Sequence, residues 1–291
     1  MKKIISKLTV KVLFIATVLL GTFNAIAQDR FGGLALYTVR NDMKEDAKAT
    51  LQAVADAGYK NIESAGYADG KFYNMSPVAF KKHVKSLGLK PISTHQGSVT
   101  LENADAMISD VKAAGFKYFV IPVPPMGMFE FNRESRTMGM KGTNAELAEI
   151  LTTLGEKCKK AGLKLLYHNH DFEFKKDKDG IVPIDYLLEN TDPKYVNFQM
   201  DLFWVTKAEA DPIAYFNKYP GRFKMWHVKD MDDEGKFAPV GEGHIDFAKI
   251  LANKKASGMK YYMVEQDNSF DQKPLDVIKI SHAGLKKIGF K

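Results

Sequence analysis

The chain has 291 residues and a formal net charge of +7, and four of its lysines lie in the first 27 residues. Without that segment 264 residues and a charge of +3 (seven less four) remain, a surplus too small to indicate a nucleic-acid partner. The single cysteine, Cys158, excludes an intramolecular disulfide and is expected to be a buried, inert thiol.

The first 27 residues have the pattern of a secretory signal peptide. Its positive charges stand at Lys2, Lys3, Lys7 and Lys11. An apolar run over residues 12–20 and a small-x-small cleavage site, Ala25-Ile26-Ala27, follow them. The run is short for a membrane span, although an uncleaved anchor is an alternative. We therefore expect export to a bacterial periplasm, with residues 28–291 as a mature chain that has no membrane contact after cleavage.

Strand-like and helix-like segments alternate from residue 33 to the end of the chain. Apolar runs predict strands at residues 33–39, 61–64, 89–95, 118–122, 165–174, 195–201, 223–228 and 261–265. Helical spacing of apolar residues predicts helices at residues 42–57, 77–87, 104–114, 143–161, 184–189, 212–217, 245–252 and 274–287. Two helix starts carry capping signals, because Ser76 precedes Pro77 and Thr143 has capping-box spacing to Glu146.

A short motif recurs where a helix passes into the next strand. Gly58, Gly88, Gly115, Gly162 and Gly258 are each followed two residues later by a lysine. A glycine at this place can end a helix in the left-handed conformation. Five copies indicate a repeated αβ unit, so eight strands and eight helices predict a (β/α)₈ TIM barrel of the α/β class, one domain over residues 28–291. An open, doubly wound sheet is the main alternative, although no GxGxxG motif follows the first strand.

The segment 122–142 is long for a connection between a strand and a helix. It is rich in proline and glycine and contains Phe129, Phe131, Arg133 and Arg136. Segments of this length are either active-site lids or surface insertions, and the sequence leaves both open.

Polar side chains stand at the ends of most predicted strands, where the chemistry of a barrel is located. These strand ends carry Glu63, His95, His168 with His170, Asp201, His227 and Glu265. Alternation along a strand places His168 and His170 on one face. Acidic side chains are rarely buried unless they are paired or bound to a cation. Because the last four strands all end in a carboxylate or an imidazole, we expect one divalent cation held by nitrogen and oxygen ligands.

These residues resemble the xylose-isomerase-like TIM barrel superfamily, which includes sugar phosphate isomerases and epimerases, inosose dehydratase and endonuclease IV. The resemblance covers nearly all of the expected mature chain. The supporting stretches are Trp226-His227-Val228-Lys229-Asp230, Val264-Glu265-Gln266-Asp267 and the loop at residues 241–247. In that family the last four strands commonly supply Glu, Asp, His and Glu as metal ligands. Asp201, His227 and Glu265 match the last three of these.

The first ligand departs from the family pattern. Relatives often have Glu-Asn-His where this chain has His168-Asn169-His170, so His168 would replace a carboxylate. The loss of one negative charge favours Mn, Co, Fe or Zn over Mg. A contact of Glu173 with the metal is an alternative. The exchange also argues against a plain epimerase, since the usual epimerase pairs two glutamates beside the metal.

The chemistry that the resemblance implies is removal of a proton beside a metal-polarised carbonyl of a sugar. Glu265 is the expected base. His95 and His170 are expected to return a proton, and Lys229 is expected to hold developing negative charge. Glu63, Tyr37 and Trp204 are the expected contacts of the sugar.

Three functions remain open from the sequence. The first is a metal-dependent enzyme acting on a small sugar, as an isomerase or epimerase or as a lyase or hydratase on a 3-keto-glycoside. The second is a nuclease, which would need more metal ligands and a basic groove. The third is a non-catalytic sugar-binding or metal-storage barrel, because a fold does not determine a function. No feature of the sequence indicates an oligomeric state.

Overall fold

The computed structural model describes residues 30–291, and the expected signal segment lies outside these residues. Eight parallel strands form a closed barrel in the order β1-β14-β11-β10-β9-β6-β5-β2. These strands are β1 (Phe31–Ala35), β2 (Tyr59–Ser64), β5 (Lys90–His95), β6 (Tyr118–Ile121), β9 (Lys164–His168), β10 (Val196–Asp201), β11 (Phe223–Val228) and β14 (Tyr261–Val264). The pairing of Leu34 with Val264 closes the ring, which confirms the predicted TIM barrel and rules out the open sheet.

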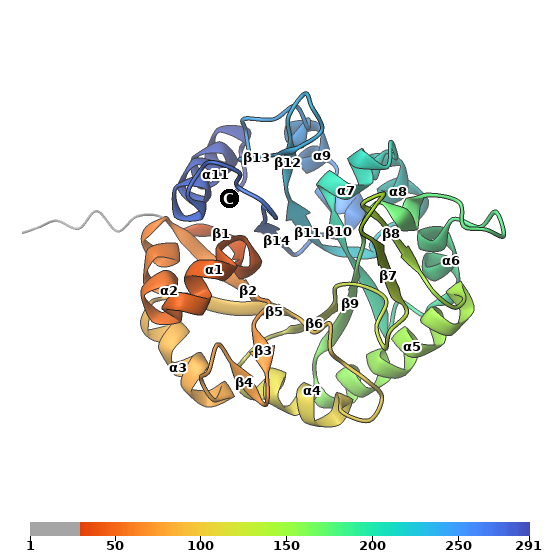
Figure 1. Cartoon of the computed structure of the whole chain (residues 1–291), viewed down its shortest axis with the longest axis horizontal. Coiled ribbons are helices and arrows are strands. Elements are labelled where there is room, and N and C mark those ends of the chain that lie inside the picture. The colour runs from red at the N-terminus through yellow and green to blue at the C-terminus, as the bar shows by residue number, and fades with distance from the viewer. Residues whose placement is uncertain (1–29) are drawn as a thin grey trace, which may run out of the picture.

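The helices form an outer ring around the strands, as the view in Figure 1 shows. They are α1 (Arg40–Glu45), α2 (Ala47–Asp56), α3 (Pro77–Ser86), α4 (Ala104–Ala113), α5 (Asn144–Ala161), α6 (Pro183–Asn190), α7 (Leu202–Lys207), α8 (Pro212–Lys218), α9 (Phe247–Ala252), α10 (Lys254–Ser257) and α11 (Pro274–Ile288). Both predicted caps are confirmed. The Ser76 hydroxyl accepts from the amide of Ala79, and Thr143 and Glu146 form a capping box.

The structure differs from the sequence prediction in several short elements. Residues 36–39, expected to continue the first strand, form the 3₁₀-helix η1 (Leu36–Val39), and a second one, η2 (Phe172–Phe174), follows β9. Helices α7 and α10 were not predicted, because six and four residues are too few to show helical periodicity. Three small antiparallel strand pairs lie outside the barrel sheet: β3 (Tyr67–Ala68) with β4 (Lys71–Phe72), β7 (Phe129–Asn132) with β8 (Thr137–Met140), and β12 (Asp230–Met231) with β13 (Phe237–Ala238).

The apolar core has two parts. The larger part lies between the strands and the helices and contains the buried Cys158, whose thiol pKa is raised to about 12 by burial. The smaller part comprises Ala35, Ile92, Tyr118, Val120, Leu166, Met225 and Met263. Two residues after Leu166, Met225 and Met263 stand His168, His227 and Glu265, the last directly after the end of β14. Since side chains two apart share a face, the smaller part is an apolar floor beneath the polar strand ends.

No helix in the described part of the chain is both long enough and apolar enough to cross a membrane.

Helix α11 packs against the loop after β13 so closely that only glycine fits at the contact. A Cβ atom added to Gly284 would lie 1.8 Å from the backbone oxygen of Val240. We expect Gly284→Ala to lower the free energy of unfolding by about 3 kcal/mol, because backbone must move to accept the methyl group. Gly139→Ala is the matched control, since its added Cβ would meet no atom within 4 Å. Urea unfolding of both variants checks this, and equal stability of the two would contradict the packing described.

Candidate functional site

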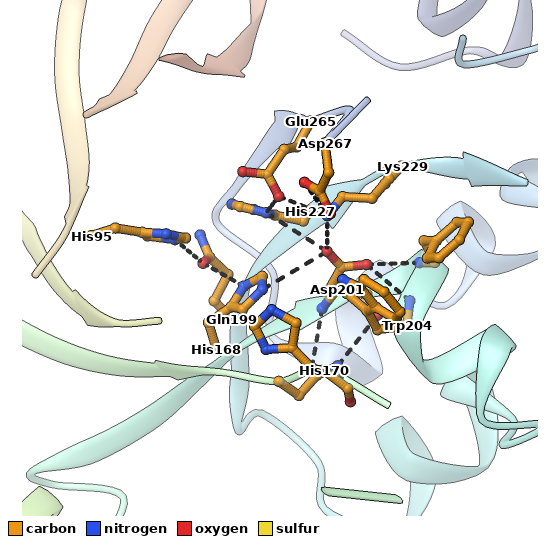
Figure 2. Close-up of polar contacts among 12 residues, drawn as sticks. His95, His168, His170, Gln199, Asp201, Trp204, His227, Lys229, Glu265 and Asp267 are labelled. Carbon is orange, nitrogen blue, oxygen red and sulfur yellow. Dashed lines mark hydrogen bonds and ion pairs between the residues drawn. The ribbon is translucent and has the colours of Figure 1, made fainter. Parts of the chain in front are cut away.

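The ends of β9, β10, β11 and β14 bring their polar side chains to one point at the carboxyl end of the barrel (Figure 2). Single ligand atoms of Asp201, His227 and Glu265 all lie within 4.8 Å of one another, and those of His95, His168 and His227 do so as well. Asp201 Oδ2 lies 3.9 Å from His168 Nε2 and 3.9 Å from His227 Nδ1. The structure thus brings together the four residues that the sequence predicts as metal ligands.

Asp201 has two separate tasks because its two oxygens point in different directions. Oδ1 accepts hydrogen bonds from the amides of Phe203 and Trp204 at 2.9 and 3.0 Å and so caps α7. Oδ2 faces the site, is fully buried and forms an ion pair with the ammonium of Lys229 at 2.9 Å. The cap holds the carboxylate in one orientation, while Oδ2 needs a positive charge beside it.

Glu63 supports His227 from below. Glu63 Oε1 lies 2.6 Å from His227 Nε2, while Glu265 Oε2 lies 2.9 Å from His227 Nδ1. Burial lowers the pKa of His227, but the charges of Glu265 and Glu63 outweigh burial and raise it to about 10. Both oxygens of Glu63 are used within the protein, and Glu63 does not line the cavity. The structure therefore places Glu63 as a support for the histidine and not at the expected contact with sugar hydroxyls.

Gln199 connects the remaining histidines, and the sequence analysis missed it. Its Oε1 lies 2.9 Å from His95 Nε2 and 3.0 Å from His168 Nδ1, and its Nε2 donates to Glu63 at 2.7 Å. Because an amide oxygen only accepts, the proton of His168 belongs on Nδ1, which leaves the Nε2 lone pair facing Asp201. The available signal was a polar side chain two residues before Asp201 on the same face of the strand.

Lys229 brings a positive charge into the same cluster. Its ammonium lies 2.9 Å from Asp201 Oδ2, 2.8 Å from Glu265 Oε2 and 3.0 Å from Asp267 Oδ1. Burial lowers the pKa of Lys229, but the carboxylates of Asp201, Asp267 and Glu265 together raise it well above its usual value. Figure 2 shows the amine among these acids. The charge that Lys229 contributes is therefore permanent at ordinary pH.

His170 and Trp204 lie beside the cluster with polar atoms that remain free. Among the described residues, His170 Nδ1 and Trp204 Nε1 are buried and have no hydrogen-bond partner. Burial and then the charge of Lys229 lower the pKa of His170 to about 3, so its imidazole is neutral. Burial favours the neutral form of His95 too, but Glu63 outweighs this and raises the pKa of His95. The two imidazoles are therefore suited to different proton roles.

A cavity of about 660 Å³ opens above the cluster. Its lining includes His95, His168, His170, Trp204, Lys229, Glu265 and Asp267. Tyr37 and Phe131, which are 41% and 53% exposed, also line it, together with Arg136 and Met138. Phe131 and Met138 belong to the β7–β8 hairpin, so the segment 122–142 forms part of the cavity wall.

The donor atoms fit a divalent cation. Ligand atoms at about 2.1 Å from one cation lie roughly 3 to 4 Å from each other. Here Asp201 Oδ2 lies 3.9 Å from both His168 Nε2 and His227 Nδ1, and His227 Nδ1 lies 2.9 Å from Glu265 Oε2. The carboxylate of Glu63 behind His227 is the usual outer partner of a metal-bound histidine. Oδ2 of Asp201, a buried carboxylate oxygen that requires a positive charge beside it, faces the same point. Lys229 shares two of these oxygens and would neighbour the cation.

The comparisons with known proteins agree with the barrel fold. A family model described as xylose isomerase-like TIM barrel matches residues 51–288. The inosose dehydratase of Lacticaseibacillus casei is 31% identical over 258 residues, which cover 86% of this chain and 75% of that protein.

Two solved structures add to the comparison. A sugar phosphate isomerase/epimerase from Parabacteroides distasonis is 27% identical, with a TM-score of 0.74 and coverage of 89% of this chain and 98% of that one. A xylose isomerase-like TIM barrel protein from Mycobacterium smegmatis in complex with magnesium has a TM-score of 0.60 over 84% of this chain and 88% of that one. At 14% identity the latter shows a shared fold alone.

Glu173 lies under the site as a buried acid, and its titration should be visible in the stability of the protein. It accepts hydrogen bonds from the Tyr167 hydroxyl at 2.7 Å and the His170 amide at 2.8 Å. Burial raises its pKa to about 8, although these hydrogen bonds oppose the shift. Because the pKa of Glu173 is higher in the folded state than in the unfolded state, the folded state binds the proton more tightly. The stability that this proton contributes is therefore complete at low pH and is lost as the pH rises through about 8.

In the wild type we therefore expect the free energy of unfolding to fall by about 1 kcal/mol for each pH unit between pH 5 and 8. In Glu173→Gln, which has no carboxyl group at this position, this fall should be absent. Urea unfolding at several pH values measures this slope. Glu149→Gln, the same change at an exposed glutamate of α5, is the control and should keep the wild-type slope. A Glu173→Gln protein with an unchanged slope would show that Glu173 is ionised throughout.

Proposed function

Since the chain belongs to the family of xylose isomerase-like TIM barrels, we propose that it is a metal-dependent lyase that acts on a sugar carrying a carbonyl group. The observation that carries the proposal is the convergence of Asp201, His227 and Glu265, whose ligand atoms lie within 4.8 Å of one another beneath an open cavity. The proposed ligands of the cation are His168, Asp201, His227 and Glu265.

A divalent cation bound there would supply Lewis-acid polarisation of a substrate carbonyl. Two of its four ligands would be imidazoles, which favours Mn, Co, Fe or Zn over Mg. Cations of this kind bind neutral histidine, and both His168 and His227 have an outer partner that places the proton on the far nitrogen.

The proposed reaction is elimination from a 3-keto-glycoside. A base takes the proton from C2, the electrons of that C–H bond form the C1=C2 double bond, and the bond from C1 to the glycosidic oxygen breaks. The leaving oxygen gains a proton and departs as the free alcohol. No oxidant or reductant is needed, because the carbonyl is already present in the substrate.

Each step of this reaction can be assigned to a residue of the site. Glu265 lines the cavity, and since its described polar contacts use Oε2, Oε1 is left to act as the base. His95, whose charged form is favoured by Glu63, is the proton donor to the leaving oxygen. Neutral His170 and the indole N–H of Trp204 have free polar atoms to bind sugar hydroxyls. Lys229 holds Asp201 and Glu265 in place and offsets negative charge on the substrate.

Elimination is favoured over isomerisation for two reasons. The relative from Lacticaseibacillus casei is a dehydratase, and dehydration is also an elimination beside a carbonyl. In addition, the exposed rings of Tyr37 and Phe131 at the cavity rim could hold a second ring, as the aglycone of a glycoside requires. Isomerisation or epimerisation is the second candidate, because the Parabacteroides distasonis neighbour is a sugar phosphate isomerase/epimerase and the first proton transfer would be the same.

We also propose that the protein is located in the periplasm. The charged, apolar and small-residue pattern of residues 1–27 supports export to the periplasm. Sugar phosphates are mostly cytosolic, so the proposed substrate carries no phosphate.

The metal site can be tested with a change of one oxygen. Asp201→Asn keeps the cap of α7 but replaces the proposed ligand, so we expect a loss of Mn²⁺ affinity of at least about a hundredfold in a protein that still folds, because Lys229 keeps Glu265 and Asp267 as partners. Asp211→Asn is the control, because Asp211 caps α8 in the same way at 2.8 Å from the amide of Ile213. Calorimetric titration with Mn²⁺ measures the affinity. Equal affinity of both variants would remove Asp201 from the ligand set.

The reaction can be tested with p-nitrophenyl 3-keto-glucoside in deuterated buffer. We expect release of p-nitrophenol by the metal-loaded protein and a loss of at least about a thousandfold in Asp201→Asn. Deuterium at C2 without release of p-nitrophenol would replace the lyase by the isomerase or epimerase candidate. Tight binding with neither release nor exchange would favour the non-catalytic barrel.

A further inference from the structure

Seven of the eight barrel strands begin within one residue of a lysine or an arginine. These residues are Arg30, Lys60, Lys90, Lys117, Lys164, Lys224 and Lys260. Five of them are the lysines of the repeated glycine motif. Because each copy of the motif precedes a barrel strand, each of these lysines lies at the end of the barrel where the strands begin. We call these seven residues the basic ring. The basic ring surrounds the end opposite to the candidate active site, because parallel strands all begin at one end and finish at the other.

The basic ring encloses a hollow and does not cover a flat face. A cavity of about 480 Å³ is lined by Arg30, Lys60, Lys90, Lys117 and Lys260, with Lys254 beside them. A second hollow of about 520 Å³ shares Lys117 and Lys260 with the first and adds Lys164. Among the residues that the structure describes, no aspartate or glutamate lines either hollow.

The basic ring is not neutralised by neighbouring acids. No member forms an ion pair with a carboxylate in the described residues, whereas Lys157 and Lys279 elsewhere pair with Asp105 and Asp276. The effect of this crowding is visible at Lys224, whose pKa is lowered by burial and then by Lys260 and Lys164. Like charges held together without a counter-charge destabilise the folded state, and a bound anion would relieve this repulsion.

Interaction with helix ends does not account for these lysines. Lysines near the carboxyl end of a helix are favourable because the last carbonyl groups carry partial negative charge. The last turns of α5 and α10 already contain Lys159 with Lys160 and Lys254 with Lys255. Lys164 and Lys260 lie beyond these turns, at the starts of the strands, and are therefore additional to what the helices need.

We propose that the end of the barrel where the strands begin binds a compact polyanion bearing two or more phosphate or sulfate groups. Compactness follows from the concave shape, since a hollow of about 480 Å³ admits a small ligand that several lysines can contact together. Phosphate or sulfate follows from the chemistry, because lysines offer point charges and flexible donors. The hydroxyl of Tyr261 lines the same hollow, accepts from Lys117 at 2.7 Å and keeps its own hydrogen to donate to an anion oxygen. This proposal does not depend on the proposed lyase activity.

The test compares two triple variants with equal change in net charge. Lys60→Gln, Lys90→Gln and Lys260→Gln together remove three members of the basic ring. Lys44→Gln, Lys71→Gln and Lys178→Gln together remove three exposed lysines from segments that follow strand ends, on the opposite side of the barrel. The probes are inorganic tripolyphosphate and a trisulfated disaccharide. Binding is measured by calorimetry at ionic strengths of about 0.02 and 0.15 M, because exposed charges are screened by salt.

We expect at least one probe to bind the wild type, at least about tenfold weaker binding by the basic-ring variant, and less than about twofold weaker binding by the control variant. The tighter probe then identifies phosphate or sulfate as the recognised group. Because a ligand that binds only the folded state stabilises it, the same probe should raise the melting temperature of the wild type and not that of the basic-ring variant.

Several results would overturn the proposal. They are binding of neither probe by the wild type, an equal loss in both triple variants, and lysine-dependent binding only to vesicles of anionic phosphatidylglycerol. The first result would show that the lysines bind neither anion. The second would show that the loss depends on net charge and not on the position of the lysines. The third would show that the basic ring binds an anionic membrane surface and not a small ligand. Sugar turnover should stay unchanged in the basic-ring variant, so failure here is distinguishable from failure of the lyase proposal.

Discussion

The structure depends above all on the burial of several charged groups at one end of the barrel. Glu63, Asp201 and Glu265 are almost fully buried, and each would be costly to bury without a positive partner. Lys229 and His227 provide that partner through contacts of 2.6 to 2.9 Å. The balance of charge explains why so many polar side chains can share a water-poor space, and a divalent cation among the same oxygens would extend it.

Neighbouring elements are arranged to keep this cluster in place. Helix α7 begins at Asp201 and fixes one of its oxygens, while Asn169 Oδ1 accepts from the Asp201 amide at 3.1 Å. The apolar floor fills the barrel interior next to these polar side chains and leaves them no space there. A rigid arrangement of this kind is what catalysis by preorganised charge requires. Gln199 orients the imidazole of His168 without adding charge.

The two ends of the barrel differ in charge. Acids and imidazoles gather where the strands end, and lysines gather where they begin, so the small net surplus of positive charge conceals two strongly polar ends. A modest net charge could not show where the charges lie. Only the closure of the barrel brings basic residues from seven strands to one end, where five of them line one hollow.

The sequence by itself determined the repeat, the barrel and the residues at the strand ends, because apolar runs, glycine caps and strand alternation are local properties that need no distant partner. Asp201, His227 and Glu265 were found in this way. Tertiary structure alone decided which atoms meet: that Gln199 joins two histidines, that Glu63 supports His227 and does not line the cavity, and that Lys229 bridges acids from β10 and β14. Such roles depend on distances between strands far apart in the chain, and these distances are set by packing and barrel closure.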